Sequence, residues 1–193
     1  MEQESKDNIQ SLNTVQLFVF ELSNEDYAIE IEYVKEITKS EEKKITPLPN
    51  VPSFIKGITN VRGQVVPVID LEEKFNLTKK DAKFIVILEM YDTTVGMLVD
   101  DVEEVMRVKE NRIKDSPKIL EEKIHTNYMK GVAVLDERLI IILDLNKGFG
   151  EEEAVEMKEI TDKMSSDEKE EEVEEISEEE LKKMAAKKAR NIR

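Results

Sequence analysis

The sequence predicts an all-β fold, a barrel or a sandwich, made of two similar subdomains and followed by a charged C-terminal extension. Two segments, residues 55–75 (IKGITNVRGQVVPVIDLEEKF) and 129–149 (MKGVAVLDERLIIILDLNKGF), are similar without a gap at an offset of 74 residues. Short apolar runs separated by turn residues recur up to residue 150 and leave little room for a long helix. After Gly150 the composition changes abruptly to charged residues.

Identical residues at matching positions support the repeat. They are Lys56 and Lys130, Gly57 and Gly131, Asp70 and Asp144, Leu71 and Leu145, and Phe75 and Phe149. A weaker pair, residues 27–37 and 95–105, precedes the two copies in the same order at an offset of 68 residues. We therefore expect two subdomains, roughly residues 15–80 and 81–150, which could exchange strands and which leave a groove between them.

The first half begins with a predicted hairpin. Residues 15–21 (VQLFVFE) alternate imperfectly between apolar and polar side chains, and residues 27–31 (YAIEI) alternate cleanly. Residues 23–26 between them are typical of a turn, so the two segments are expected to pair as antiparallel strands.

A short helical turn and a rigid loop are expected next. Val34 and Ile37 in residues 33–38 are three positions apart, which favours a helical turn. Three prolines in residues 47–52 fix their φ angles and lack amide donors, so this segment cannot be helical.

A second hairpin follows the proline-rich loop. Its strands are residues 58–61 and 65–70, joined by residues 62–64, in which Gly63 suits a positive φ at a tight turn. Pro67 cannot donate a hydrogen bond to a neighbouring strand, so its strand is expected to lie at an edge or to carry a bulge.

The second half repeats this layout after a short helical turn at residues 71–75. Its expected strands are residues 84–89, 95–99, 105–109, 131–135 and 139–143. The total of roughly ten short strands is typical of β-barrels and β-sandwiches.

Both ends of the chain are polar. We expect residues 1–14 to be a flexible N-terminus and residues 15–150 to form the folded part. Residues 151–193 hold 16 acidic and nine basic side chains, with the acidic ones first, an order that suits a helix dipole. Because the apolar stripe of this tail is thin, we expect the tail to be partly helical or disordered.

Composition excludes several functional classes. The absence of Cys excludes disulfides, thiol nucleophiles and Cys-ligated zinc. A net charge of −15 repels phosphate backbones and no Trp is present for base stacking, so we expect no nucleic-acid partner. No apolar run reaches the roughly 18 residues of a membrane span, and we expect a soluble, cytosolic protein with no direct membrane insertion.

The sequence offers little to catalysis. The one histidine, His125, lies in a polar stretch and is expected at the surface, and no G-x-S-x-G motif supplies a nucleophile. Asp100 and Asp101 could ligate a metal, but adjacent residues on a strand point to opposite faces. We therefore expect no catalytic residue, no cofactor and no metal site.

Arg62 is the strongest candidate for a contact with a partner. It lies at a predicted hairpin tip between Asn60 and Gly63, where its planar guanidinium could bind a partner's backbone or carboxylate. The second copy has Asp136 at this position, so the two tips are not interchangeable. The alternative is a solvated turn arginine. The two apolar residues of the 33–38 segment are similarly either core or the floor of a groove.

Four segments together resemble the CheW family, the coupling proteins of bacterial and archaeal chemotaxis. They are ITPLPNVPSFIKGITNVRGQVVPVIDL, YAIEIEYVKEI, VGMLVDDVEEV and MKGVAVLDERLIIILDL. The resemblance covers about residues 15–149, and the core PLP-x-x-P-x-F-I-x-G-x-x-N-x-RG-x-x-x-P-V-x-DL has family spacing without a gap. It implies two small five-stranded β-barrels packed around a shared apolar seam. The extension after Gly150 departs from the compact family pattern.

The resemblance also implies a non-catalytic adaptor of the chemotaxis array. Members of the family bind the cytoplasmic tip of methyl-accepting chemoreceptors and the regulatory domain of the histidine kinase CheA, so the chain would lie in the cytoplasm at membrane receptor arrays. The positions that match the receptor groove are Ile31, Val34 and Ile37. The positions associated with coupling, to receptor or kinase, are Gly57, Asn60, Arg62 and Gly63.

Three other functions compete with this one. A CheV-like adaptor needs a receiver domain, which the 43 residues after Gly150 cannot supply. An enzyme would need a carboxylate site that the motifs do not reveal. A CheW-fold scaffold could instead bind other signalling partners, basic proteins among them, through its charged tail.

Overall fold

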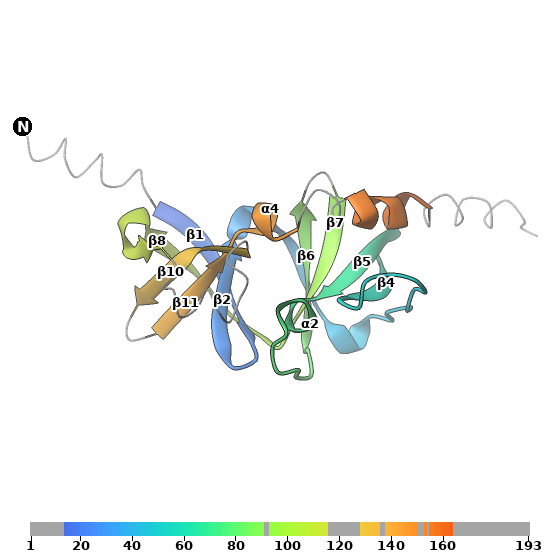
Figure 1. Cartoon of the computed structure of the whole chain (residues 1–193), viewed down its shortest axis with the longest axis horizontal. Coiled ribbons are helices and arrows are strands. Elements are labelled where there is room, and N and C mark those ends of the chain that lie inside the picture. The colour runs from blue at the N-terminus through green and yellow to red at the C-terminus, as the bar shows by residue number, and fades with distance from the viewer. Residues whose placement is uncertain are drawn as a thin grey trace, which may run out of the picture.

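Two β-sheets stand side by side in the computed structural model of the chain (Figure 1). The structure describes residues 14–90, 93–115, 128–135, 138–149, 153 and 155–163. The predicted flexible N-terminus (apart from its last residue), His125, Asp136 and most of the charged tail lie outside these residues. Among the described helices, none has the length and apolar character needed to cross a membrane.

The first sheet has six strands in the order β8-β1-β2-β11-β10-β9. All neighbours are antiparallel except β2 and β11, which run parallel. The bounds are β1 Thr14–Leu22, β2 Glu25–Glu30, β8 Asp101–Lys109, β9 Ile113–Lys114, β10 Met129–Leu135 and β11 Arg138–Leu143.

The second sheet has five strands in the order β3-β6-β7-β5-β4, with a single parallel pair, β5 and β7. The bounds are β3 Val34–Lys39, β4 Ile55–Val61, β5 Gln64–Asp70, β6 Phe84–Met90 and β7 Thr93–Val99. The β4–β5 hairpin corresponds to β10–β11, β6–β7 to β1–β2, and β3 to β8. The two sheets therefore share one five-stranded topology, to which the first adds the two-residue strand β9.

This arrangement confirms the predicted all-β class with two similar units. The barrels are open, because in the described residues the outermost strands of each sheet do not pair with each other. The units also exchange strands along the chain: the N-terminal hairpin β1–β2 belongs to the sheet that β8 to β11 complete, while β3 to β7 form the other sheet.

The helices are few and short. They are the 3-10 turns η1 Ile31–Tyr33, η2 Ser40–Glu42 and η3 Glu110–Arg112, and the α-helices α2 Leu71–Phe75 and α4 Leu145–Gly148. A further C-terminal helix covers residues 155–163. In α2 and α4 the aspartate before the helix, Asp70 or Asp144, accepts a hydrogen bond from the backbone N–H three residues later. The matching aspartates of the repeat are therefore helix N-caps.

The predicted helical turn at residues 33–38 is wrong. The only helical turn there is η1, which ends at Tyr33, and β3 follows directly and pairs with β6. A spacing of three apolar residues does not distinguish a helix from an irregular strand, and the β-branched side chains of Val34, Ile37 and Thr38 favour the strand.

Strand β1 is buried on both faces. Leu17 and Val19 lie in a core cluster inside the first sheet, whereas Phe18 and Phe20 lie in the largest cluster, which joins both sheets. This explains the imperfect alternation of residues 15–21, because a strand covered on two sides needs a continuous apolar run.

The largest cluster forms the seam between the sheets. Phe20 stacks on Phe18 and Tyr27 with ring centroids 5.9 and 6.3 Å apart, and Leu88 and Met97 of the second sheet belong to the same cluster. Burial of each large apolar side chain contributes about 1.5–3 kcal/mol before entropy is counted. A third cluster fills the second sheet, formed by Val61, Val66, Ile85 and Ile87.

Candidate functional site

The β4–β5 hairpin ends in a two-residue turn made of Arg62 and Gly63. Val61 pairs with Gln64, and the turn residues have φ angles of +53° and +83°, as a type I′ turn requires. The Asn60 side-chain oxygen accepts a hydrogen bond of 2.8 Å from the Gly63 N–H. An arginine in this conformation costs roughly 1 kcal/mol, and its side chain is 80% exposed.

The Arg62 side chain reaches the opposite edge of its own sheet. Strands β3 and β4 are the two ends of the strand order, yet Arg62 Nε lies 2.9 Å from Glu36 Oε2 on β3. The sheet is therefore curled until its edges approach. Because an exposed ion pair contributes little to stability, its main effect is to hold the guanidinium beside β3.

The three residues predicted for a receptor groove lie in η1 and β3 and differ in exposure. Ile31 in η1 and Val34 in β3 are partly buried and pack against the seam cluster. Ile37 is 42% exposed, and the bulge between Val34 and Glu36 puts Val34 and Ile37 on one face of β3, opposite Leu88 and Val86 of β6. Glu36, the ion-pair partner of Arg62, is next to Ile37 in the chain but lies on the other face of β3. The receptor-contact role of all three residues stays a prediction.

Gly57 lies at a β-bulge in β4 and not at the hairpin tip. Its φ is +141°, and a Cβ atom there would stand 2.1 Å from the carbonyl oxygen of Thr46. Thr46 and Ile58 exchange backbone hydrogen bonds of 2.8 and 2.9 Å at this point. Gly57 therefore allows the proline-rich loop to pack on β4, and its link to coupling, which stays a prediction, would act through that loop.

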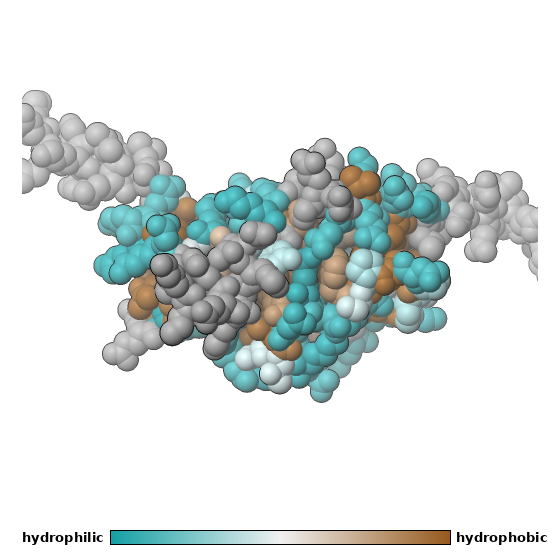
Figure 2. Space-filling view, viewed as in Figure 1, coloured by the Kyte–Doolittle hydropathy of each residue, from teal (hydrophilic) through white to brown (hydrophobic). Residues whose placement is uncertain are grey.

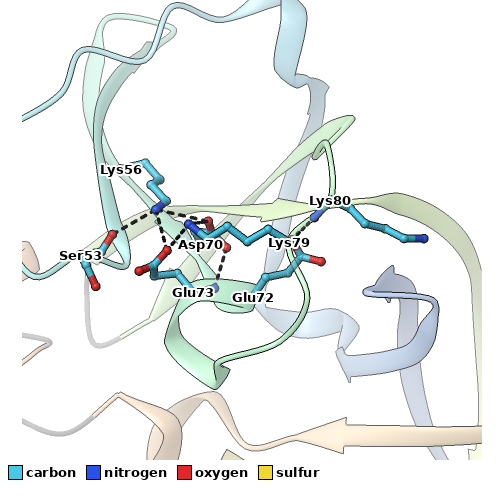
Figure 3. Close-up of polar contacts among 7 residues, drawn as sticks. All are labelled: Ser53, Lys56, Asp70, Glu72, Glu73, Lys79 and Lys80. Atoms are coloured by element: carbon cyan, nitrogen blue, oxygen red, sulfur yellow. Dashed lines mark hydrogen bonds and ion pairs between the residues drawn. The ribbon is translucent and has the colours of Figure 1, made fainter.

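Ion pairs tie β4 to α2 beneath this loop (Figure 3). Lys56 Nζ donates to the Ser53 carbonyl oxygen at 3.1 Å and lies 3.3 Å from Glu73 and 3.4 Å from Asp70. Lys79 also binds Glu73. The hydrogen bond from Lys79, and after it the one from Lys56, lower the pKa of Glu73 to about 2. Each charged side chain of this cluster is paired with one of opposite charge. The cluster therefore supports the loop and has no group free for a reaction.

Lys74 sits in an aromatic cage that sequence patterns did not reveal. Its ammonium lies 4.1 Å from the ring centre of Phe54, 4.8 Å from that of Phe149 and 5.3 Å from that of Tyr128. Both carboxylate oxygens of Glu153 accept hydrogen bonds of 2.6 Å from it. Cation–π contacts and a buried ion pair thus connect the two halves to the start of the C-terminal helix. Of the residues in this cage, only Phe149 stood out in the sequence, as the repeat partner of Phe75.

The two adjacent aspartates do not form a metal site. Asp100 is 4% exposed and points inward, whereas the Asp101 carboxylate binds Lys83 at 2.6 Å. In the part of the chain that the structure describes, no three His, Asp or Glu side chains are grouped so as to hold a metal ion.

Exposed apolar side chains are scattered. On the face seen in Figure 2, small separate apolar areas interrupt a mostly hydrophilic surface. The large exposed apolar residues among those described are Ile37, Val105, Val134, Leu139 and Val155. The exposed apolar side chains of the described residues therefore form small areas with polar surroundings.

Comparisons with known proteins identify the family. A CheW-like domain matches residues 16–153, which is most of the chain. The chain belongs to the CheW-like family. A CheW chemotaxis protein of Klebsiella aerogenes is 34% identical over 141 residues, which cover 72% of this chain and 83% of that protein. A CheW chemotaxis protein of Thermotoga maritima is 30% identical over 139 residues, which cover 71% of this chain and 89% of that protein.

A solved structure extends the similarity to the fold. The crystal structure of the scaffolding protein CheW from Thermoanaerobacter tengcongensis matches with a TM-score of 0.65 and 35% identity, over 72% of this chain and 94% of the other. The predicted resemblance is thus confirmed. This CheW-like chain is a member of a non-catalytic family of chemotaxis scaffolding proteins, and the expectation that it is not an enzyme is confirmed at that level.

Proposed function

We propose that this CheW-like chain is the adaptor that couples methyl-accepting chemoreceptors to the histidine kinase CheA at cytoplasmic receptor arrays. The relatives named CheW and the shared fold support the role. One observation supports the site above all: Arg62 keeps a left-handed backbone at an exposed hairpin tip. Asn or Gly would occupy that position at lower energy, and such strain is typically kept for a contact.

We assign the partners to two surfaces of the molecule. The coupling surface consists of the Asn60–Gly63 turn together with Glu36 of β3. The seam surface consists of Ile31 and Val34, where the apolar cluster between the sheets reaches the outside, and of Ile37 on the same face of β3 as Val34. A receptor tip is helical and would place apolar side chains on the seam surface, while a similarly folded kinase domain would meet the coupling surface at the barrel edge.

A pull-down with matched arginine variants tests this assignment. The purified chain is mixed with the CheA regulatory domain and with a receptor tip fragment, separately and together. Arg62→Asn should reduce ternary assembly at least tenfold, which is about 1.4 kcal/mol. Arg138→Gln is the control, because Arg138 is also exposed and ion-paired, with Asp26 at 2.8 Å, but lies on the other sheet.

The outcomes separate the surfaces. Ile37→Glu and Val34→Ala should both weaken the receptor complex, whereas Arg62→Asn should weaken the kinase complex. Equal binding by Arg62→Asn and by the unmodified chain would contradict the coupling surface.

The charged tail provides the second candidate function, and a truncation decides between the two. The deletion must begin after Lys163, because Met157 is 1% exposed in the seam cluster and Ile160 packs on it. An adaptor of the CheW type keeps kinase and receptor binding when residues 164–193 are removed. Loss of both would move the function to the tail.

A further inference from the structure

Two carboxyl groups are buried together where the chain crosses between the sheets. Glu72 lies in α2, which packs beside the second sheet, and Asp100 lies between β7 of that sheet and β8 of the other. Each is 4% exposed. Both line the same cavity, and burial, followed by the charge of Asp100, raises the pKa of Glu72.

Each carboxyl has one oxygen bound to a backbone N–H and one oxygen left over. Glu72 Oε2 accepts from the Lys80 N–H at 2.9 Å, and Asp100 Oδ2 accepts from the Ser23 N–H at 2.7 Å. In the described residues no donor reaches Glu72 Oε1 or Asp100 Oδ1. A buried carboxylate oxygen without a donor is costly, and a proton on one of two neighbouring carboxyls would give both such oxygens a partner.

The nearby cations are engaged elsewhere. Lys80 directs its Nζ to Glu21 at 3.3 Å and to the Asn24 side chain, and Lys56 pairs with Asp70 and Glu73. The other charged groups of the cavity, Asp70 and Asp81, add negative charge. From the first sheet, Tyr27 faces Glu72 and is neutral at ordinary pH, because burial and Glu25 raise its pKa.

We propose that Glu72 and Asp100 share one proton, and that this acid pair is a pH-sensitive lock between the two sheets. Glu72 Oε1–H donates to Asp100 Oδ1. The bonds from Ser23 and Lys80 then connect the β1–β2 turn, α2 and the β7–β8 crossover into one unit. Loss of the proton leaves two like charges buried side by side, and this junction opens before the rest of the fold.

The direction of the Glu72 shift agrees with this geometry. Burial has the largest effect on Glu72 and raises its pKa, and Asp100 raises it further. The hydrogen bond from the Lys80 N–H acts in the opposite direction but does not cancel the rise. A carboxyl whose pKa is higher in the folded than in the unfolded state contributes stability that is complete below the unfolded value of about 4.3. That contribution is lost as the pH rises through the folded value.

The test compares urea unfolding of the full chain with that of Glu72→Gln and Glu73→Gln between about pH 4 and pH 9. Gln keeps a donor at position 72 at every pH, so the midpoint of Glu72→Gln should exceed that of the unmodified chain increasingly toward alkaline pH. Glu73 is the neighbouring control, because its pKa shifts downward and its ion pairs are at the surface. Glu73→Gln should show no alkaline gain.

A second measurement does not depend on the variants. Carbon-13 NMR of the unmodified chain should show Glu72 titrating well above the other glutamates, with amide exchange at Ser23 and Lys80 rising over the same pH range. The proposal would be overturned if the urea midpoints of the chain and of Glu72→Gln differed by the same amount at every pH and Glu72 titrated like the other glutamates. Stabilisation by added Mg²⁺ or Ca²⁺ that Glu72→Gln abolishes would also overturn it, in favour of a bridging cation.

Discussion

At the scale of single residues, Arg62 combines a cost to the fold with a position open to partners. Its backbone has a φ of +53°, its side chain is 80% exposed, and its one ion pair is to Glu36. None of these features is what stability alone would select. The neighbouring Gly63, in contrast, has the residue type that the turn requires.

Replacing Arg62 should therefore leave the fold at least as stable. Asn tolerates the left-handed conformation, so Arg62→Asn should raise the free energy of unfolding by up to about 1 kcal/mol, less the small contribution of the Glu36 pair. Urea unfolding measures this. A loss of more than about 1 kcal/mol would mean that the arginine is structural.

Glu73 should make stability depend on pH at the acid end. Hydrogen bonds from Lys79 and Lys56 hold its folded pKa at about 2, below the unfolded value of about 4.3. The stability it contributes is present above the unfolded value and is lost as the pH falls through the folded one. Acid unfolding of Glu73→Gln should therefore start from a lower plateau at neutral pH and be less steep than that of the unmodified chain.

Single residues were predicted correctly where they interact with residues only a few positions away in the chain. The turn role of Gly63 follows from its neighbours, and the caps Asp70 and Asp144 were visible as a repeat pair. The Lys74 cage was not predictable, because Phe54, Tyr128 and Glu153 are distant in the sequence and only the fold brings them together.

At the scale of elements, β4 and β10 carry the same device. Each has a bulge followed by a glycine, Gly57 or Gly131, at which a neighbouring segment approaches too closely for a side chain. The approaching atoms are the carbonyl oxygens of Thr46 and Lys114. The repeat thus preserves the need for a residue without a side chain at this position. In the sequence, this need is visible only as two matching glycines.

Substituting Gly57 should damage the element and not only its surface. Gly57→Ala places Cβ 2.1 Å from the Thr46 oxygen at an unfavourable φ, so we expect a loss of roughly 3 kcal/mol in unfolding free energy. Gly63→Ala is the matched control: its φ is also positive, but its Cβ would meet nothing within 4 Å, and it should cost roughly 1 kcal/mol. Equal losses for the two variants would show that the contact with Thr46 is relaxed in solution.

The element that sequence reading got wrong is β3. Its apolar residues Val34 and Ile37 fit a helical spacing, but they lie in a strand that pairs with β6, and the bulge between Val34 and Glu36 places both on one face, opposite Leu88 and Val86. Period alone could not decide over six residues, because tertiary pairing outweighs so short a pattern.

At the scale of the whole molecule, one apolar cluster holds both sheets and the C-terminal helix together. Met157 from that helix is 1% exposed within it. The helix lies at the end of, and mostly beyond, the residues that match the CheW-like domain. It therefore extends the seam of the family fold in this chain.

The C-terminal helix should be part of the cooperative fold. Met157→Ala should lower the unfolding free energy by about 2–5 kcal/mol, because it empties a packed position. Val155→Ala on the same helix should change it by less than about 0.5 kcal/mol, since Val155 is 56% exposed. Thermal unfolding of both variants measures the difference, and an unaffected Met157→Ala would mean that the helix is not docked in solution.

The overall architecture could be predicted because the repeat is a long-range signal in one sequence. Segments 74 residues apart fold into equivalent hairpins of two sheets with one topology. The exchange of strands between the units was allowed for but could not be derived, since it depends on which hairpin completes which sheet.

The coupling account as a whole is tested most directly by kinase phosphorylation in reconstituted receptor assemblies. We predict that receptors alter CheA activity only when this chain is present, that Arg62→Asn reduces the effect at least tenfold, and that Arg138→Gln leaves it unchanged. Receptor control of the kinase that is equally strong with Arg62→Asn, or without the chain, would contradict the account.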